Sequence, residues 1–159
     1  MKLRNTFLLV LLLIVYVPVT FAQKGINWSE DGLYYTKVKD GNIVKIDPKT
    51  ESETVIVKKE QLTPAGASKA LWPQSYAYSS DKTKLLIFTN TAKVWRYKTR
   101  GDYWVLNLAN SELHQVGKSA PSQSLMFAKF SPDGKQVAYV SEHNLFSEDV
   151  SSGVARKLT

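Results

Sequence analysis

The chain has no cysteine and very little histidine, and these shortages exclude several kinds of chemistry. Its 159 residues include no Cys and only two His. Without thiols the protein has no disulfides, no thiolate metal ligands and no cysteine nucleophile. The two histidines and the scattered acids do not show the spacing of a metal-binding motif. We therefore expect no metal and no cofactor, and a fold that is stabilised by packing alone.

Catalytic motifs are also missing. The sequence has no Gly-x-Ser-x-Gly segment, which is the turn that presents the nucleophile of α/β-hydrolases. His114 falls in a predicted outer strand and His143 in a predicted hairpin turn, so we expect both imidazoles to be solvated rather than catalytic. We therefore assign no catalytic residue and expect this chain by itself to be inactive.

A long hydrophobic run occurs only at the N-terminus. Lys2 and Arg4 precede the apolar run Phe7–Val19, and a plausible cleavage site ends at Ala22; this pattern predicts a signal peptide over residues 1–22 and one domain over residues 23–159. The run is shorter than the roughly 20 residues of a membrane-spanning helix, and an uncleaved membrane anchor is the alternative. Both versions predict export, to the periplasm or out of the cell.

The charge pattern argues against nucleic acid as a partner. The formal net charge is +7, or +5 if Lys2 and Arg4 leave with the signal peptide. The other lysines are scattered among acids instead of forming a basic stripe, and no nucleic-acid-binding motif is present. We interpret them as the solvated faces and turns of strands.

The most informative feature that is present is a short repeated phrase: an aromatic residue, Ser, any residue and Asp. Its copies are Trp28–Asp31, Tyr78–Asp81 and Phe130–Asp133, which begin 50 and 52 residues apart. A repeat of about this length is typical of β-propeller blades, each of which is a four-stranded sheet. We expect the Ser and Asp to hydrogen-bond the turn that follows, and Trp28, Tyr78 and Phe130 to pack between blades.

Strand signals dominate the rest of the chain, and no segment after residue 22 shows helical periodicity. The predicted strands are Leu33–Val38, Asn42–Ile46, Thr54–Val57, Ser75–Tyr78, Lys84–Thr89, Tyr103–Leu106, Leu113–Val116, Leu125–Phe130, Gln136–Ser141, Asn144–Glu148 and Val154–Leu158. Residues 60–73 are predicted to form a long connection with at most a helical turn. The predicted fold is all-β: an incomplete β-propeller of about three four-stranded antiparallel blades, preceded by the signal helix.

The middle copy of the repeat is longer than the others. The turn residues Asp47 and Asp149 follow the start of their phrases by 19 positions, whereas Asn107 follows Tyr78 by 29. Roughly ten residues are therefore inserted in the second blade. In repeat proteins such an insertion marks a loop on one face, often the binding face.

Three blades do not close a ring, because propellers have about four to eight. An open ring leaves a sheet edge and a blade face exposed, which favours aggregation. We therefore expect this sequence to be the front part of a longer protein, with assembly of several chains as the alternative. Recombinant residues 23–159 should then be poorly soluble.

Several segments together are specific enough to suggest a family. These are Lys84–Thr91, Val94–Tyr97, Gly101–Leu108 and Phe127–Val140, with a looser fit over residues 27–47. They resemble the N-terminal propeller of bacterial dipeptidyl peptidase IV, a prolyl oligopeptidase-type serine peptidase. The most specific part is the inserted Trp-Arg pair followed by Asp-Tyr-Trp.

The resemblance implies an eight-bladed propeller that covers an α/β-hydrolase domain of the same chain and is compatible with a homodimer. Such enzymes release dipeptides with Pro or Ala in second position from peptide N-termini. One propeller arginine, in a Trp-Arg pair, contacts the substrate backbone carbonyl. Arg96 matches it, with Trp95 beside it, and lies in the insertion. The alternative is a surface arginine stacked on Trp95.

The sequence also departs from the family. The adjacent glutamates that bind the substrate amino terminus are missing: Glu51 and Glu53 flank Ser52, and Glu142 and Glu148 are isolated. We therefore keep two hypotheses. The chain is either the N-terminal propeller fragment of an exported dipeptidyl peptidase, without its catalytic domain, or a non-enzymatic periplasmic propeller that binds or scaffolds other molecules.

Overall fold

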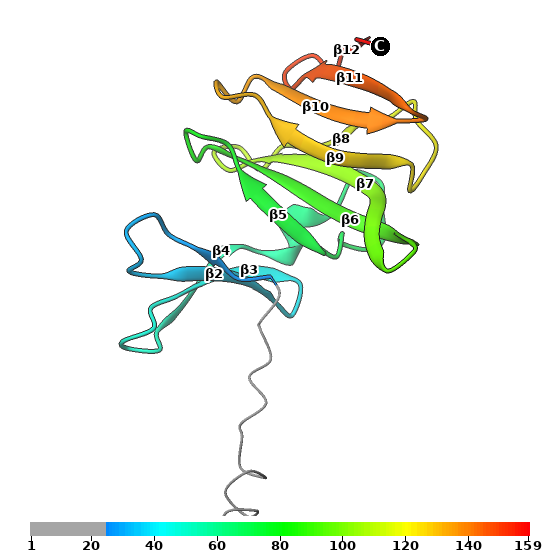
Figure 1. The fold of residues 1–159 in the computed structure, drawn as a ribbon. Helices are drawn as coiled ribbons and strands as arrows, with labels where there is room; N and C mark the ends of the chain where they lie inside the picture. Colours follow the sequence, from blue (N-terminus) through cyan, green and yellow to red (C-terminus); the bar gives the residue numbers. More distant parts are fainter. Residues whose placement is uncertain (1–24) are drawn as a thin grey trace, which may run out of the picture.

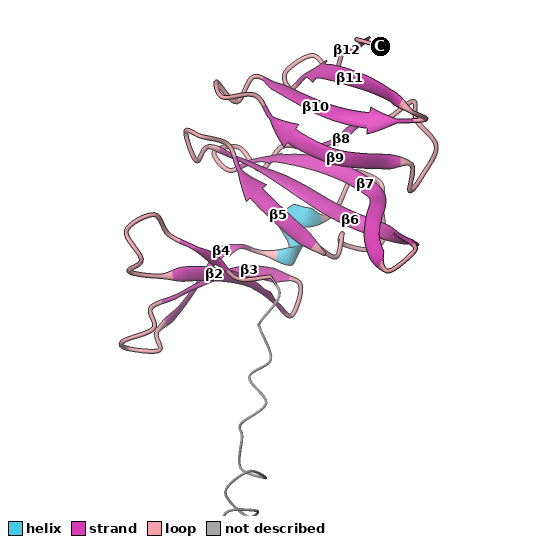
Figure 2. Cartoon of the chain, in the orientation of Figure 1, coloured by secondary structure: helices cyan, strands magenta, loops and turns pink. Residues whose placement is uncertain are grey.

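The structure is a computed structural model that describes residues 25–159 (Figure 1), so the predicted signal peptide lies outside the described residues. Strands make up nearly all of the regular structure, and one short helix follows the first sheet (Figure 2). The predicted all-β class is confirmed. Over residues 25–159 the search for a helix of membrane-spanning length and hydropathy returns none.

The strands agree closely with the predicted ones, and the predicted connection over residues 60–73 contains the one helical turn. The elements are β1 (Asn27–Trp28), β2 (Tyr35–Lys39), β3 (Asn42–Ile46), β4 (Glu53–Val57), the 3₁₀ helix η1 (Lys59–Leu62), β5 (Ser75–Tyr78), β6 (Lys84–Val94), β7 (Tyr97–Asn107), β8 (Leu113–Val116), β9 (Leu125–Phe130), β10 (Gln136–Ser141), β11 (Asn144–Asp149) and β12 (Ala155–Lys157). The bounds of β3, β5, β8, β9 and β10 are the predicted ones. Only β6 and β7 are much longer than expected.

The strands form three successive groups of four antiparallel strands, as the repeat predicts. The first sheet has the order β1-β2-β3-β4. The second and third groups are not separate sheets, however, because β7 also pairs with β9 through Arg100 opposite Met126 and Gly101 opposite Leu125. Strands β5–β8 and β9–β12 thus share one eight-stranded sheet, which Figure 1 shows in green to red above the blue first blade.

Strand β6 shows how the blades share their cores. Leu85 and Ile87 pack into a cluster with Ile43, Val57 and Leu62 of the first blade region. The residue between them, Leu86, points the other way, into a second cluster with residues of β9 and β10. Because side chains alternate along a strand, one central strand contributes to both cores, and this explains its continuous apolar sequence.

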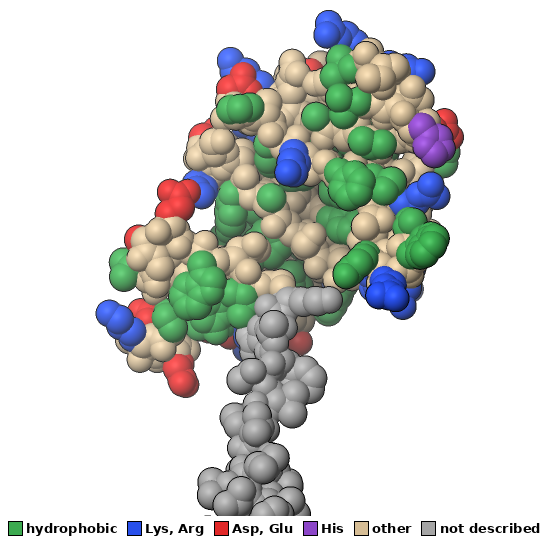
Figure 3. Space-filling view, viewed as in Figure 1, with side chains coloured by type: hydrophobic (Ala, Val, Ile, Leu, Met, Phe, Trp, Pro, Cys, Tyr) green, Lys and Arg blue, Asp and Glu red, His purple; other side chains and the backbone are tan. Residues whose placement is uncertain are grey.

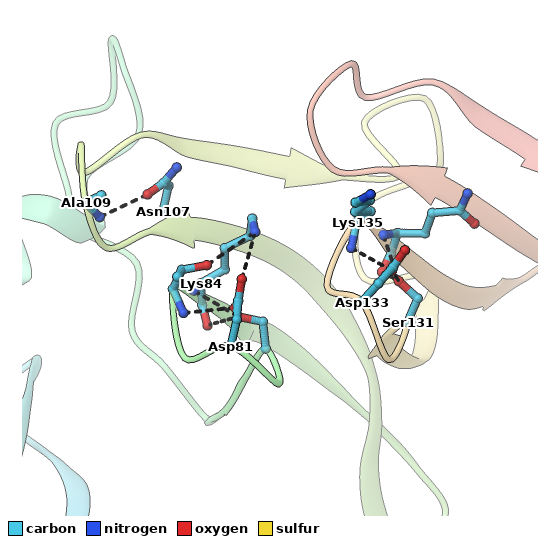
Figure 4. Close-up of polar contacts among 10 residues, drawn as sticks. Asp81, Lys84, Asn107, Ala109, Ser131, Asp133 and Lys135 are labelled. Atoms are coloured by element: carbon cyan, nitrogen blue, oxygen red, sulfur yellow. Dashed lines mark hydrogen bonds and ion pairs between the residues drawn. The ribbon is translucent and has the colours of Figure 1, made fainter.

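The repeated phrase builds the same turn in each blade, and Figure 4 shows the second and third copies. In the second copy Ser79 Oγ donates to Asp81 Oδ1 at 2.6 Å and accepts from the Lys84 N–H at 3.0 Å, while the Thr83 N–H donates to Asp81 Oδ1 at 3.1 Å. The first and third copies make the equivalent three bonds. The predicted turn role of Ser and Asp is confirmed.

The aromatic residues of the phrase behave differently from one another. Tyr78 packs against the cluster between the first and second blades, and Phe130 against the cluster between the second and third. Trp28 is 60% exposed and contacts only the tilted ring of Tyr35 among the described aromatic residues, with ring centroids 5.3 Å apart, so its predicted position between blades is wrong in this structure. It lies on β1, a two-residue edge strand, where no described blade covers it.

The turn aspartates predict a loss of stability in acid. Hydrogen bonds from Ser79 and Thr83 lower the pKa of Asp81 to about 2, and those from Ser151 and Ser152 lower the pKa of Asp149 to about 2. A folded pKa below the unfolded value of about 3.9 stabilises the protein above pH 4. We expect the midpoint of urea unfolding of the complete protein to fall as the pH drops from 4 to 2. It should fall less in the double variant Asp81→Asn, Asp149→Asn, because the two carboxylates that take up protons are absent. An unchanged pH profile in that variant would contradict this assignment.

Candidate functional site

The insertion in the second blade is a projecting two-stranded arm. Within the blade, Lys84–Thr89 of β6 pairs with residues 102–107 of β7; beyond that point the two strands continue as Ala92 opposite Arg100, Lys93 opposite Lys98 and Val94 opposite Tyr97, with register shifts near Ala92. We call residues 90–101 the arm. It was predicted as a loop. It pairs as strands because its two halves are adjacent in sequence and meet through a tight turn.

The tip of the arm is a two-residue turn made of Trp95 and Arg96. Trp95 has φ of +60° and is 95% exposed. Left-handed backbone suits glycine and is unusual for a bulky residue, and holding such a residue there costs roughly 1–3 kcal/mol. An aromatic side chain that is both strained and solvated gains nothing from core packing, so packing does not explain why Trp95 stands at this position.

Arg96 lies at the end of the arm and is exposed. The cation–π contacts recorded within residues 25–159 join Lys45 to Tyr34 and Lys82 to Tyr78, so stacking of Arg96 on Trp95 is not observed. No hydrogen bond or ion pair within that range uses the guanidinium. Its donors, which keep a fixed geometry and a permanent charge, are therefore available to a ligand.

The arm is uniformly basic. Between residues 90 and 101 the charged residues are Lys93, Arg96, Lys98 and Arg100, with no acid among them. Lys93 and Lys98 lie directly opposite each other, an arrangement that destabilises a strand pair, and Lys98 Nζ donates to Gln74 Oε1 at 2.9 Å. Figure 3 shows basic side chains flanking exposed hydrophobic ones where Figure 1 places the end of the arm. This surface suits carbonyl and carboxylate oxygens.

Gly101 allows the arm to leave the blade. A Cβ at this position would lie 2.5 Å from Cε2 of Phe88 and 2.7 Å from the backbone oxygen of Thr89. No side chain fits at such distances. The glycine thus permits the close approach of β7 to β6 at the point where β7 also pairs with β9.

The substitution Gly101→Ala should therefore destabilise the protein. We expect a loss of about 1–3 kcal/mol, because the methyl group overpacks a site that contains backbone. The urea midpoint of the complete protein measures it. Arg100→Ala, which removes an exposed neighbour without adding atoms, should stay within about 0.5 kcal/mol of the parent. Equal urea midpoints for Gly101→Ala and the parent would show that the residues around Gly101 shift to accept the methyl group without a loss of stability.

The two histidines do not form a catalytic group. His143 is exposed in the β10–β11 turn, as predicted. His114 lies in β8, as predicted, but its Nε2 is buried and has no hydrogen-bond partner within the described chain, so its predicted solvation is wrong. His114 also lines a cavity of about 840 Å³ between the second and third blades, at the opposite end of β6 and β7 from the arm.

Glu148 is a buried residue whose role the sequence did not reveal. It is 3% exposed, and its Oε2 accepts hydrogen bonds from the Gly117 N–H at 2.8 Å and from the Tyr139 hydroxyl at 3.2 Å. Burial and the negative charge of Glu148 raise the pKa of Tyr139 to about 12. Glu148 therefore joins β11 to the β8–β9 connection, beside the cavity that it also lines. Within residues 25–159, no three His, Asp or Glu side chains gather where they could hold a metal ion.

Comparison with known proteins identifies the family. The model of the dipeptidyl peptidase IV N-terminal region matches residues 79–159, about half of the chain, including the whole arm. The chain belongs to this family. The probable dipeptidyl-aminopeptidase B of Tuber melanosporum is 30% identical over 136 residues, which cover 77% of this chain and 14% of the relative. The dipeptidyl aminopeptidase B of Saccharomyces cerevisiae is 28% identical over 132 residues, covering 83% of this chain and 15% of the relative.

Solved structures show the same architecture. The crystal structure of Porphyromonas gingivalis dipeptidyl peptidase 4 superposes with a TM-score of 0.71 at 22% identity, covering 88% of this chain and 20% of that one. TolB from Acinetobacter baumannii superposes with a TM-score of 0.50 at 18% identity, covering 85% of this chain and 31% of that one. At these identities both superpositions show only that the fold is similar. The chain thus spans between 14% and 20% of the length of the dipeptidyl peptidase relatives that it matches.

Proposed function

We propose that this chain is the first part of the propeller of an exported serine exopeptidase that releases N-terminal dipeptides with Pro or Ala in second position. Its own contribution is to hold the peptide. The catalytic serine and histidine, and the hydrolase domain that carries them, would belong to the rest of the complete protein. The observation that supports this most is the basic arm of a dipeptidyl peptidase IV-type domain, with Arg96 at its tip exposed and making no side-chain hydrogen bond within residues 25–159.

The arm suits a peptide main chain for chemical reasons. A guanidinium donates two parallel hydrogen bonds and is never deprotonated near neutral pH, so it can bind a backbone carbonyl oxygen without regard to the side chain. Such binding places the scissile bond relative to a nucleophile supplied from elsewhere, which is catalysis by positioning. The exposed Trp95 ring offers an apolar surface beside that carbonyl.

The test uses the complete protein encoded by the gene that carries this sequence. We expect it to hydrolyse Gly-Pro and Ala-Pro p-nitroanilides, to leave an N-acetylated Ala-Pro amide intact, and to lose activity with a serine-directed phosphonofluoridate. A purified protein that does none of these things, yet folds as a stable particle, would instead support the non-enzymatic periplasmic propeller.

Export is part of the proposal and has its own measurement. The pattern of residues 1–22 predicts removal at Ala22, so the mature protein should begin at Gln23 and be recovered outside the cytoplasm. An N-terminus that retains residues 1–22 in the membrane fraction would select the anchored form.

A further inference from the structure

A second group of polar side chains ties the base of the arm to the third blade. Asn90 lies on β6 and Asp102 on β7, where the arm begins, and Ser122 and Gln123 come from the connection between β8 and β9. Asn90 Nδ2 donates to Asp102 Oδ2 at 2.7 Å and to Ser122 Oγ at 3.0 Å. We call these four residues the latch.

The latch uses the hydrogen-bonding capacity of its members almost fully. The Gln123 backbone N–H donates to Asp102 Oδ1 at 2.7 Å, and Gln123 Nε2 donates to Asn90 Oδ1 at 2.9 Å. Ser122 Oγ also contacts Asp102 Oδ2 at 3.3 Å. Both oxygens of Asp102 and both ends of the Asn90 amide are therefore engaged, so the four groups specify one arrangement rather than many.

Stability does not explain this arrangement. The bonds are exposed to solvent, where water competes for the same donors and acceptors and reduces the net gain from each bond. At the same time Gln123 holds a φ of +59°, a region that a long side chain adopts at a cost. Asn90 has a φ of +45°, which asparagine tolerates better than most residues. A network that contributes little to stability and maintains strain is better explained by the geometry that it imposes.

That geometry controls the position of the tip. From Asn90 to Trp95 the arm extends five residues, roughly 16 Å at about 3.3 Å per residue. A rotation of about 10° at the base would therefore move the tip by roughly 3 Å, and a misplacement of about 1 Å can already cost 100-fold in rate. The pairs Arg100–Met126 and Gly101–Leu125 attach only one strand of the arm; the latch also fixes the other strand through Asn90.

We propose that Asn90, Asp102, Ser122 and Gln123 are positioning residues, which hold the arm at the angle where Arg96 meets the peptide main chain. This inference rests on the proposed function. The four residues touch no substrate in this scheme. They act through the arm. The connection between β8 and β9, which leads into the third blade, thereby sets the angle of an arm that belongs to the second blade.

The test compares Asp102→Ala with the parent in the complete protein, and repeats the comparison in an Arg96→Ala background. With Ala-Pro p-nitroanilide we expect Asp102→Ala to lower kcat/KM about tenfold, mainly through KM, and to increase amide hydrogen exchange in residues 90–101. In the Arg96→Ala background the same change should cost less than twofold, because the group that the latch positions is absent. Asp102→Asn keeps one acceptor oxygen, so its kcat/KM should lie between those of the parent and of Asp102→Ala.

The matched control is Asn110→Ala in the β7–β8 turn. It removes a side chain that donates to Glu112 Oε2 at 3.2 Å and accepts from the Glu112 N–H at 3.0 Å, both exposed, and it should leave kcat/KM unchanged. If Asp102→Ala lowered kcat/KM equally in both backgrounds, or in neither, the proposed positioning role of the latch would be overturned. An Arg96→Ala protein with normal kinetics, or a complete protein without peptidase activity, would instead overturn the proposed function, whatever Asp102→Ala does to hydrogen exchange.

Discussion

Arg96→Ala should lower kcat/KM on Ala-Pro p-nitroanilide by about 10- to 100-fold, with most of the change in KM. A hydrogen bond from a charged donor contributes about 1.5–3 kcal/mol, and each 1.36 kcal/mol corresponds to about a factor of ten. The loss should fall on KM because the bonded carbonyl is present in the bound substrate as well as in the transition state. Steady-state kinetics on the complete protein measure both constants.

Two variants make this result specific. Arg96→Lys keeps the charge but loses the forked donor geometry, so it should recover only part of the activity. Arg156→Ala removes an exposed arginine from β12, far along the sheet from the arm, and should match the parent. Kinetics of Arg96→Ala that equal those of Arg156→Ala would remove the arm tip from substrate binding.

Glu148→Ala should give the largest loss of stability among the polar substitutions, about 2–4 kcal/mol. The change leaves the Gly117 N–H and the Tyr139 hydroxyl without their acceptor in a buried site, and each unsatisfied buried donor costs about 1–3 kcal/mol. The free energy of unfolding from urea titration, followed by the near-ultraviolet signal of the tyrosines, measures the effect on the complete protein.

The control for this substitution is Glu60→Ala. Glu60 is exposed in η1, so its removal should change the unfolding free energy by no more than about 0.5 kcal/mol. Glu148→Gln keeps an acceptor oxygen and should lose less than Glu148→Ala. If Glu148→Ala were as stable as Glu60→Ala, water would be replacing the carboxylate. The hydrogen bonds from Glu148 would then contribute nothing to the free energy of unfolding.

Local chemistry explains why so much of the fold was predictable. The Ser and Asp of each repeated phrase bond backbone groups no more than five residues away, so the turn forms wherever the phrase occurs. Strands such as β9 and β10 alternate and end at turn residues, and their predicted bounds were correct. The excess of ten residues in the middle copy also indicated the arm, and with it Arg96, before any contact was known.

The missed features all depend on partners that are distant in sequence. Trp28 and Tyr78 begin the same phrase, yet only Tyr78 has a described blade on each side. Glu148 gave no signal because a lone acid in a strand looks solvated until its neighbours are known, and His114 was misjudged for the same reason. The latch was invisible because Asp102 meets Gln123 across 21 positions.

The repeat, the blade order, the turn chemistry and the place of Arg96 in an insertion follow from the amino-acid sequence itself, because short-range hydrogen bonds and strand alternation determine them. Tertiary structure alone decided that two blades share one sheet and that four polar residues hold the base of the arm. These outcomes depend on which distant surfaces come into contact, and a linear pattern of residues carries little information about such contacts.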